Sequence, residues 1–136
     1  MIPTPDFAIT SQRVITPQGE KAAAILIHGE KILDIISISE IPSVCPVEDM
    51  GNHVVMPGLV DTHVHINEPG RTDWEGFETA TKAAAAGGIT TLVDMPLNCI
   101  PVTTTVNALN QKIEATKDQL WIDCGFYGGI IPDNIQ

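Results

Sequence analysis

The chain has 136 residues, of which 17 are acidic and 7 basic, so its formal net charge at pH 7 is −10. A chain this acidic is a poor partner for nucleic acid or an anionic membrane surface, because both require basic patches. Its 43% hydrophobic and 18% charged residues exclude intrinsic disorder and indicate a folded globular protein.

The cysteines and the N-terminal residues indicate the cellular compartment in which the protein is expected. Three cysteines at wide spacing, Cys45, Cys99 and Cys124, form neither a disulfide framework nor a zinc knuckle, which favours a reducing setting. The first residues lack the basic and apolar regions of a secretory signal. The longest clean apolar run, 22–27, is far shorter than the ~20 residues that span a bilayer. We expect an intracellular protein, in the cytoplasm, with no membrane partner and the organelle left open.

Residues 1–53 predict a small β-unit. Turn residues at 17–19 and 29–30 separate short β-prone runs, and a Gly-Glu pair between two such runs favours a tight hairpin. The runs are 7–10, 13–16, 23–28 and 31–37.

From residue 54 onward the pattern predicts strands that alternate with helices. The expected order is strand 59–66, helix 74–86, strand 89–95, helix 103–119 and strand 120–126. Such an order is typical of a parallel sheet with right-handed crossovers. It fits an open doubly wound sheet as well as a (β/α)8 barrel, and a whole barrel needs ~250 residues.

Both predicted helices carry local signals. Thr72 and Glu75 have the spacing of a capping box, and the pair of glycines at 87–88 predicts the end of the first helix. One face of that helix is expected to bury Phe77, Ala80 and Ala84. In the second helix the 3.6-residue stripe is Val106, Leu109, Ile113 and Thr116.

The densest chemical signal is Asp61-Thr62-His63-Val64-His65. Alternate residues of a strand share a face, so His63 and His65 present two imidazoles side by side where barrel enzymes build active sites. Imidazole nitrogens suit zinc and similar divalent ions. Asp61 is expected on that face one pleat lower, as a ligand neighbour or an acceptor for a ligand. A bare His-x-His also occurs by chance at a strand end.

A wider resemblance surrounds this motif. Residues 56–65, MPGLVDTHVH, resemble the opening of the amidohydrolase superfamily, whose first barrel strand carries a metal-binding His-x-His. Residues 67–77, 83–91 and 94–98 resemble the allantoinase branch, and the likeness covers most of the chain, with the N-terminal β-unit similar in kind only. Dihydroorotases usually have an Arg at the place of Asn67, which holds the substrate carboxylate. Allantoin has no carboxylate, so Asn67 favours a neutral hydantoin ring.

The resemblance implies an α/β fold in which residues 1–53 form part of a composite β-sandwich. Residues 54–136 would begin a TIM-like (β/α)8 amidohydrolase barrel, truncated after about three βα units. The implied reaction is hydrolysis of allantoin to allantoate with two zinc ions, in a homotetramer. His63 and His65 would bind the more buried ion.

The remaining ligands implied by the resemblance are a carboxylated lysine that bridges the two ions, two further histidines and a general-base Asp. All are expected beyond residue 136, so no catalytic residue is expected within the chain. We therefore expect this chain alone to lack activity, as a fragment, a truncated gene model or a short isoform.

Several interpretations stay open. Asn98, in the loop after the second barrel strand, is a candidate substrate-binding residue or a turn residue. Asp94 either gives polar support to the site or caps the local backbone. For Glu68 and Arg71, a role at the helix entry or in an ion pair is favoured over a role in catalysis. The alternative functions are a dihydropyrimidinase, hydantoinase or dihydroorotase-like enzyme, and a non-catalytic interaction protein. Glycine-rich nucleotide motifs and GxSxG are absent from the sequence.

Overall fold

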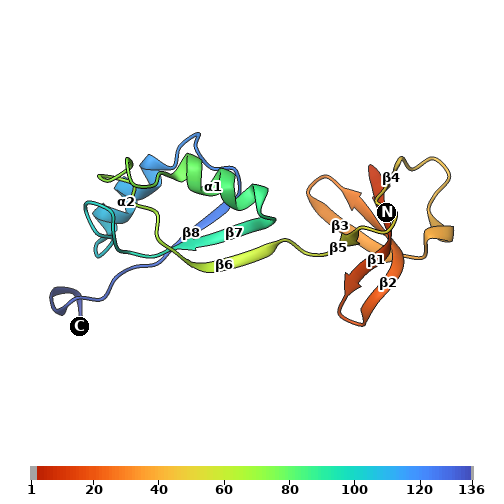
Figure 1. Cartoon of the computed structure of the whole chain (residues 1–136), viewed down its shortest axis with the longest axis horizontal. Coiled ribbons are helices and arrows are strands. Elements are labelled where there is room, and N and C mark those ends of the chain that lie inside the picture. Colours follow the sequence, from red (N-terminus) through yellow and green to blue (C-terminus); the bar gives the residue numbers. More distant parts are fainter. Residues whose placement is uncertain (1–2, 136) are drawn as a thin grey trace. The chain divides into compact units, whose positions relative to one another are not determined.

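The computed structural model describes residues 3–135, in two compact units, Met1–Pro57 and Gly58–Gln136, called here the N-terminal and C-terminal units. The first is a β-sheet with parallel and antiparallel pairs, and the second is a parallel sheet flanked by helices (Figure 1). The α/β class predicted from the sequence is confirmed. Among residues 3–135, no helix is both long enough and apolar enough to cross a membrane.

The N-terminal unit is a five-stranded sheet in the order β3-β2-β1-β4, with β5 also paired to β1. β1 pairs antiparallel with β2 and parallel with β4 and β5, and β2 pairs antiparallel with β3. A short 3-10 helix, η1, spans Ile38–Glu40. The strands are β1 (Phe7–Thr16), β2 (Gly19–His28), β3 (Lys31–Ile36), β4 (Val47–Asp49) and β5 (Val54–Val55).

The prediction of two strands at 7–10 and 13–16 is wrong, because β1 continues through a bulge between Ser11 and Val14. The hydroxyl of Ser11 accepts a hydrogen bond from the Arg13 N–H at 2.9 Å and donates to the His53 carbonyl at 2.6 Å. These bonds satisfy the backbone where the ladder is interrupted, so the irregularity bends the strand without ending it.

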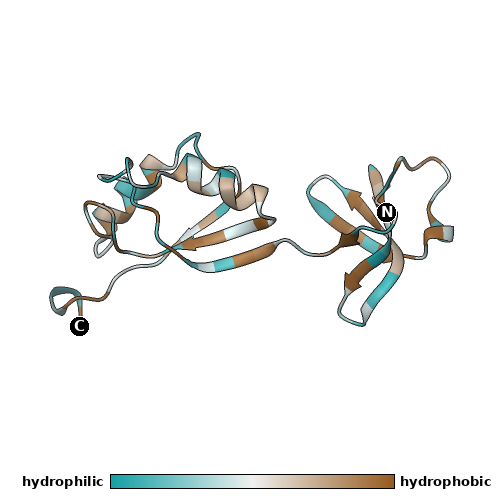
Figure 2. Cartoon of the chain, in the orientation of Figure 1, coloured by the Kyte–Doolittle hydropathy of each residue, from teal (hydrophilic) through white to brown (hydrophobic). Residues whose placement is uncertain are grey.

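Two small apolar clusters pack against this sheet, whose strands carry hydrophobic stretches, brown in Figure 2. Successive strand residues point to opposite faces, so Ile25 and Leu26 belong to different clusters. Leu26 packs with Ala8 and Cys45, and Ile25 packs with Val14 and Ala23.

The C-terminal unit has a three-stranded parallel sheet in the order β6-β7-β8. Both helices lie on the same side of this sheet (Figure 1). The predicted alternation of strands and helices is confirmed. The elements are β6 (Leu59–Val64), α1 (Phe77–Ala86), β7 (Ile89–Asp94), α2 (Val106–Ala115), β8 (Asp123–Phe126) and the 3-10 helix η2 (Pro132–Asn134).

The start of α1 differs from the prediction. The helix begins at Phe77 rather than Trp74, and its N-cap, Gly76, makes no side-chain capping bond. The carboxylate of Glu68 instead accepts a hydrogen bond from the Phe77 N–H at 2.9 Å. An acidic group at this end also complements the helix dipole. Glu68 therefore caps the helix from the preceding loop, and the expected capping box at 72–75 does not form.

The core of this unit lies between the helices and the sheet. Ile66, Phe77 and Leu92 are buried there, with Ala80 and Ala84 packed against them, which confirms the predicted face of α1. The stripe predicted for α2 is wrong. Its buried residues are Ala108 and Lys112, and the helix spans 106–115 rather than 103–119. Val106 and Ile113, placed in the stripe, are 75% and 45% exposed.

Candidate functional site

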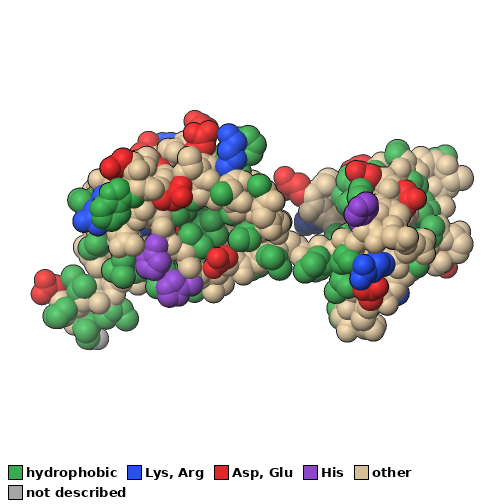
Figure 3. All heavy atoms as spheres, in the orientation of Figure 1, with side chains coloured by type: hydrophobic (Ala, Val, Ile, Leu, Met, Phe, Trp, Pro, Cys, Tyr) green, Lys and Arg blue, Asp and Glu red, His purple; other side chains and the backbone are tan. Residues whose placement is uncertain are grey.

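The two histidines of the motif lie where β6 ends. Val64 is the last residue of the strand, so His63 and His65 bracket its end, and both side chains are exposed. Their ring centroids are 5.3 Å apart (the purple pair on the C-terminal unit in Figure 3). This separation lets two imidazoles approach one ion from neighbouring positions. Both residues therefore remain candidate metal ligands.

Asp61 contacts the backbone of this segment. Its carboxylate accepts a hydrogen bond from the His63 N–H at 3.0 Å. The register between β6 and β7 shifts between Asp61 and Val64, so strict strand alternation does not carry from Asp61 to His63. Asp61 thus stabilises the turn of chain that presents His63, and its role beside a metal ligand stays a prediction.

Asn98 lies against His65. Its side-chain nitrogen is 3.3 Å from Nδ1 of His65, and which atom donates depends on the ring tautomer and the amide orientation. The φ of Asn98 is 67°, in the left-handed region that Asn tolerates better than most residues. Asn98 therefore shapes its loop and touches a candidate ligand at the same time.

Asp94 and Lys112 form a buried ion pair behind the end of β6. The side chains are 0% and 1% exposed, and the Lys112 ammonium donates to Oδ2 of Asp94. Oδ1 accepts from the Ile66 N–H at 2.7 Å. Burial raises the pKa of Asp94, while the hydrogen bonds from Lys112 and Ile66 oppose that rise. These contacts fit the interpretation of Asp94 as polar support for the site, which stays a prediction.

Other singled-out residues have local roles. Glu68 caps α1, and the Arg71 guanidinium stacks 4.8 Å from the centroid of the Trp74 ring. His28 pairs with Asp6 at 3.1 Å in the N-terminal unit. The expectation that Glu68 and Arg71 serve the entry to α1 fits these contacts.

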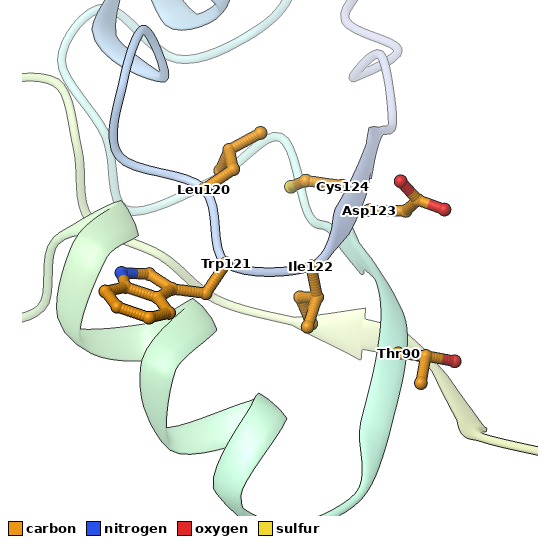
Figure 4. Close-up of a pocket in the computed structure, with 6 residues that line it drawn as sticks. All are labelled: Thr90, Leu120, Trp121, Ile122, Asp123 and Cys124. Carbon is orange, nitrogen blue, oxygen red and sulfur yellow. The ribbon is translucent and has the colours of Figure 1, made fainter. Parts of the chain in front are cut away.

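A pocket of about 640 Å³ lies away from the histidines. Thr90 and Asp123, at the beginnings of β7 and β8, line it together with Leu120–Cys124 (Figure 4). The Trp121 ring lies beside α1, 4.7 Å from Nζ of Lys82. Burial and the nearby Asp94 raise the pKa of the Cys124 thiol to about 11, so the thiol stays protonated and is a poor nucleophile.

The histidine pair supplies two candidate ligands for a metal ion. Within residues 3–135, no three side chains of His, Cys, Asp or Glu gather closely enough to hold an ion. A structural zinc ion takes four ligands and a catalytic one at least three from protein. His63 and His65 would therefore need further ligands to bind a zinc ion tightly.

Comparison with known sequences places the chain among hydrolases. The sequence model of the amidohydrolase family matches residues 54–134. An allantoinase of Streptomyces avermitilis is 54% identical over 132 residues, which cover 96% of this chain and 30% of that protein. An allantoinase of Arabidopsis thaliana is 46% identical over 138 residues, covering 98% and 27%. The chain thus spans about 30% of the length of the curated relatives it matches.

Solved structures agree with this placement. The L-hydantoinase (dihydropyrimidinase) of Arthrobacter aurescens has a TM-score of 0.83 at 33% identity, over 96% of this chain and 29% of that one. The dihydropyrimidinase of Brevibacillus agri gives a TM-score of 0.76 at 30% identity, over 91% and 27%. The family match includes both motif histidines and well over half of the sequence. The chain belongs to the amidohydrolase family.

Proposed function

We propose that this chain supplies the N-terminal part of an allantoinase, which hydrolyses the hydantoin ring of allantoin to allantoate in purine and ureide degradation. The observation that carries the proposal is the identity of 41–54% to allantoinases of bacteria, plants and yeast over nearly the whole chain. His63 and His65 lie at a strand end within this matched region.

His63 and His65 are the residues that would hold a divalent ion, with zinc as the proposed metal. Their exposed, neighbouring imidazoles fit part of a site, and the absence of a third ligand among the described residues fits a ligand set completed by other segments. A divalent ion bound there would supply Lewis-acid polarisation of the ring carbonyl. Asn98 would orient His65 or contact the substrate, and Asp61 would fix the backbone at His63.

Asn67 supports a substrate without a carboxylate. It is 9% exposed and lies in the loop after His65, where its carbonyl accepts from the Arg71 N–H at 3.0 Å. A neutral amide offers no charge to hold a substrate carboxylate. Residue 67 therefore favours allantoin over dihydroorotate.

Three parallel strands cannot close a barrel, so this architecture implies further segments. We propose that residues 1–53 contribute to a composite β-sandwich and that residues 54–136 begin the barrel, although β5 at 54–55 pairs with β1. A carboxylated lysine, two histidines and a general-base Asp would come from segments beyond residue 136. We also propose a second divalent ion, a homotetramer and a cytoplasmic location.

The test is to isolate the native polypeptide with an antibody against residues 60–100. A polypeptide long enough for a whole barrel of ~250 residues, with zinc bound and allantoin hydrolysed, is the expected result. A stable native product of only 136 residues would contradict the role as part of a working enzyme and favour a non-catalytic interaction protein.

A second candidate function is a hydantoinase or dihydropyrimidinase. The observation that favours it is the structural likeness to the Arthrobacter aurescens L-hydantoinase. Comparing kcat/KM for allantoin with that for hydantoin and dihydrouracil separates the two functions. A preference for the rings without a ureido group would support the hydantoinase.

A further inference from the structure

Asp94 and Lys112 are buried charges that have no part in the metal site proposed above. Asp94 is the last residue of β7 and Lys112 lies on α2, and both side chains are almost completely buried. A buried ion pair contributes little net stability, and apolar side chains of similar volume often replace one without loss. Packing alone therefore gives little reason for a charged pair at this position.

The hydrogen bonds of Asp94 lead to the backbone around His65. Oδ1 of Asp94 accepts from the N–H of Ile66, the residue after His65, at 2.7 Å. The carbonyl of Val64, the residue before His65, accepts from the Met95 N–H, also at 2.7 Å. Both neighbours of His65 are thus bonded to the end of β7, one to its backbone and one to a buried side chain.

We propose that Asp94, balanced in charge by Lys112, positions His65 by holding the peptide that follows it. Lys112 completes the arrangement, because its ammonium donates to Asp94 and lies 3.4 Å from the Met95 carbonyl. The side-chain hydrogen bonds of Asp94 and Lys112 go to each other and to the backbone rather than to the imidazole, so both are positioning residues. The inference rests on the proposed function, in which His65 is a metal ligand. Substitution of a group that orients a metal ligand commonly lowers metal affinity 10–100-fold.

Two double variants of the full chain separate this role from simple packing. Asp94→Asn/Lys112→Met and Asp94→Leu/Lys112→Met both remove the buried charges and nearly preserve volume. Only the Asn variant keeps an oxygen that can accept from the Ile66 N–H. Lys117→Met is the control, because it breaks an exposed ion pair with Glu114 on the same chain segment.

The readouts are amide exchange at Ile66 and the His65 ring resonances in the metal-free chain, together with the zinc affinity of the same variants in the complete enzyme, which carries the remaining ligands. We expect the Asn variant to keep Ile66 protected and the His65 resonances in place. The Leu variant should expose the Ile66 amide, shift the His65 resonances and lose about 10–100-fold in zinc affinity, at a similar unfolding midpoint. Unchanged His65 resonances in a folded Leu variant would overturn the proposal.

A backbone substitution covers the case in which the double variants fail to fold. Replacing the Ile66 amide with an ester removes the N–H donor and leaves every side chain intact, so the same shift of His65 is expected. A His65 ring that is unmoved by the ester overturns the proposal. Failure of the proposed metal site gives a different result. Zinc would then leave His63 and His65 unchanged in the unmodified complete enzyme, whereas the readouts on the metal-free chain still decide the positioning role.

Discussion

Asn98 combines a left-handed backbone conformation with a side-chain contact to His65, and two substitutions separate these properties. Asn98→Gly removes the contact and keeps the conformation, whereas Asn98→Ala removes the contact and adds backbone strain. We expect both variants of the complete enzyme to lose zinc affinity alike. Only the Ala variant should also lose stability, by about 1 kcal/mol. Zinc titration and urea unfolding measure the two effects, and full zinc affinity in Asn98→Gly would contradict the orienting role.

The motif histidines carry the metal prediction. His63→Ala or His65→Ala in the complete enzyme should lower zinc affinity by at least about 100-fold, because removing a ligand is no milder than removing a group that orients one. Allantoin hydrolysis should fall with the metal content, which atomic absorption measures. His28→Gln is the matched control, since His28 pairs with Asp6 in the N-terminal unit. Equal zinc content in all three variants would remove His63 and His65 from the site.

At the scale of elements, the start of α1 depends on a residue outside the helix. Glu68→Ala removes the acceptor for the Phe77 N–H, and loss of such a cap costs about 1 kcal/mol. The urea midpoint of unfolding should fall with no change in its slope. Glu78→Ala, an exposed residue of the first turn, is the comparison. Equal midpoints for the two variants would show that Glu68 does not cap the helix.

The two units should respond differently to acid. Hydrogen bonds from the Gly29 and Gly51 N–H groups, respectively, lower the pKa of Asp6 and Asp49. A carboxyl whose pKa is lower in the folded state stabilises the fold above its unfolded pKa, and this contribution disappears as the pH falls through the folded value. Burial shifts the pKa of Asp94 upward, so that group adds no stability that acid removes.

Amide exchange between pH 6 and pH 3 should therefore show the N-terminal unit opening first. Asp49→Asn should reduce this pH dependence, because residue 49 would no longer titrate. Loss of amide protection in the C-terminal unit before the N-terminal unit would contradict the stabilising role given to Asp6 and Asp49.

Sequence patterns predicted the elements better than their boundaries. The alternation of strands and helices and the buried face of α1 follow from periodicity, which records contacts between near neighbours. The cap from Glu68 and the burial of Lys112 depend on residues 9 and 18 positions away, Phe77 and Asp94. The buried face of α2 contains Lys112 and not the predicted stripe. A lysine is rarely buried, so the sequence pattern did not indicate that this position faces the core. The two histidines were found because they are neighbours in the sequence at one strand end, whereas Asn98 and His65 are 33 positions apart, with α1 and β7 between them.

At the scale of the whole molecule, the 136 residues alone should not hydrolyse allantoin. Two imidazoles provide too few ligands for a catalytic ion, and three strands leave the sheet open. Co-expression with the remaining segment of the Streptomyces avermitilis allantoinase should restore zinc binding and hydrolysis. The same pair carrying His65→Ala is the control, and activity of the isolated chain would contradict this expectation.

The distribution of the cysteines has a practical consequence. Cys45 is buried in the N-terminal unit, and Cys99 is buried in the C-terminal unit, where Cys124 is half-buried. A buried thiol reacts with a disulfide reagent only after the surrounding structure opens. In a chain that retains Cys45 alone, the rate of thiol modification would therefore report the opening of the N-terminal unit. In a chain that retains Cys99 alone, it would report the opening of the C-terminal unit, and neither measurement needs an added label.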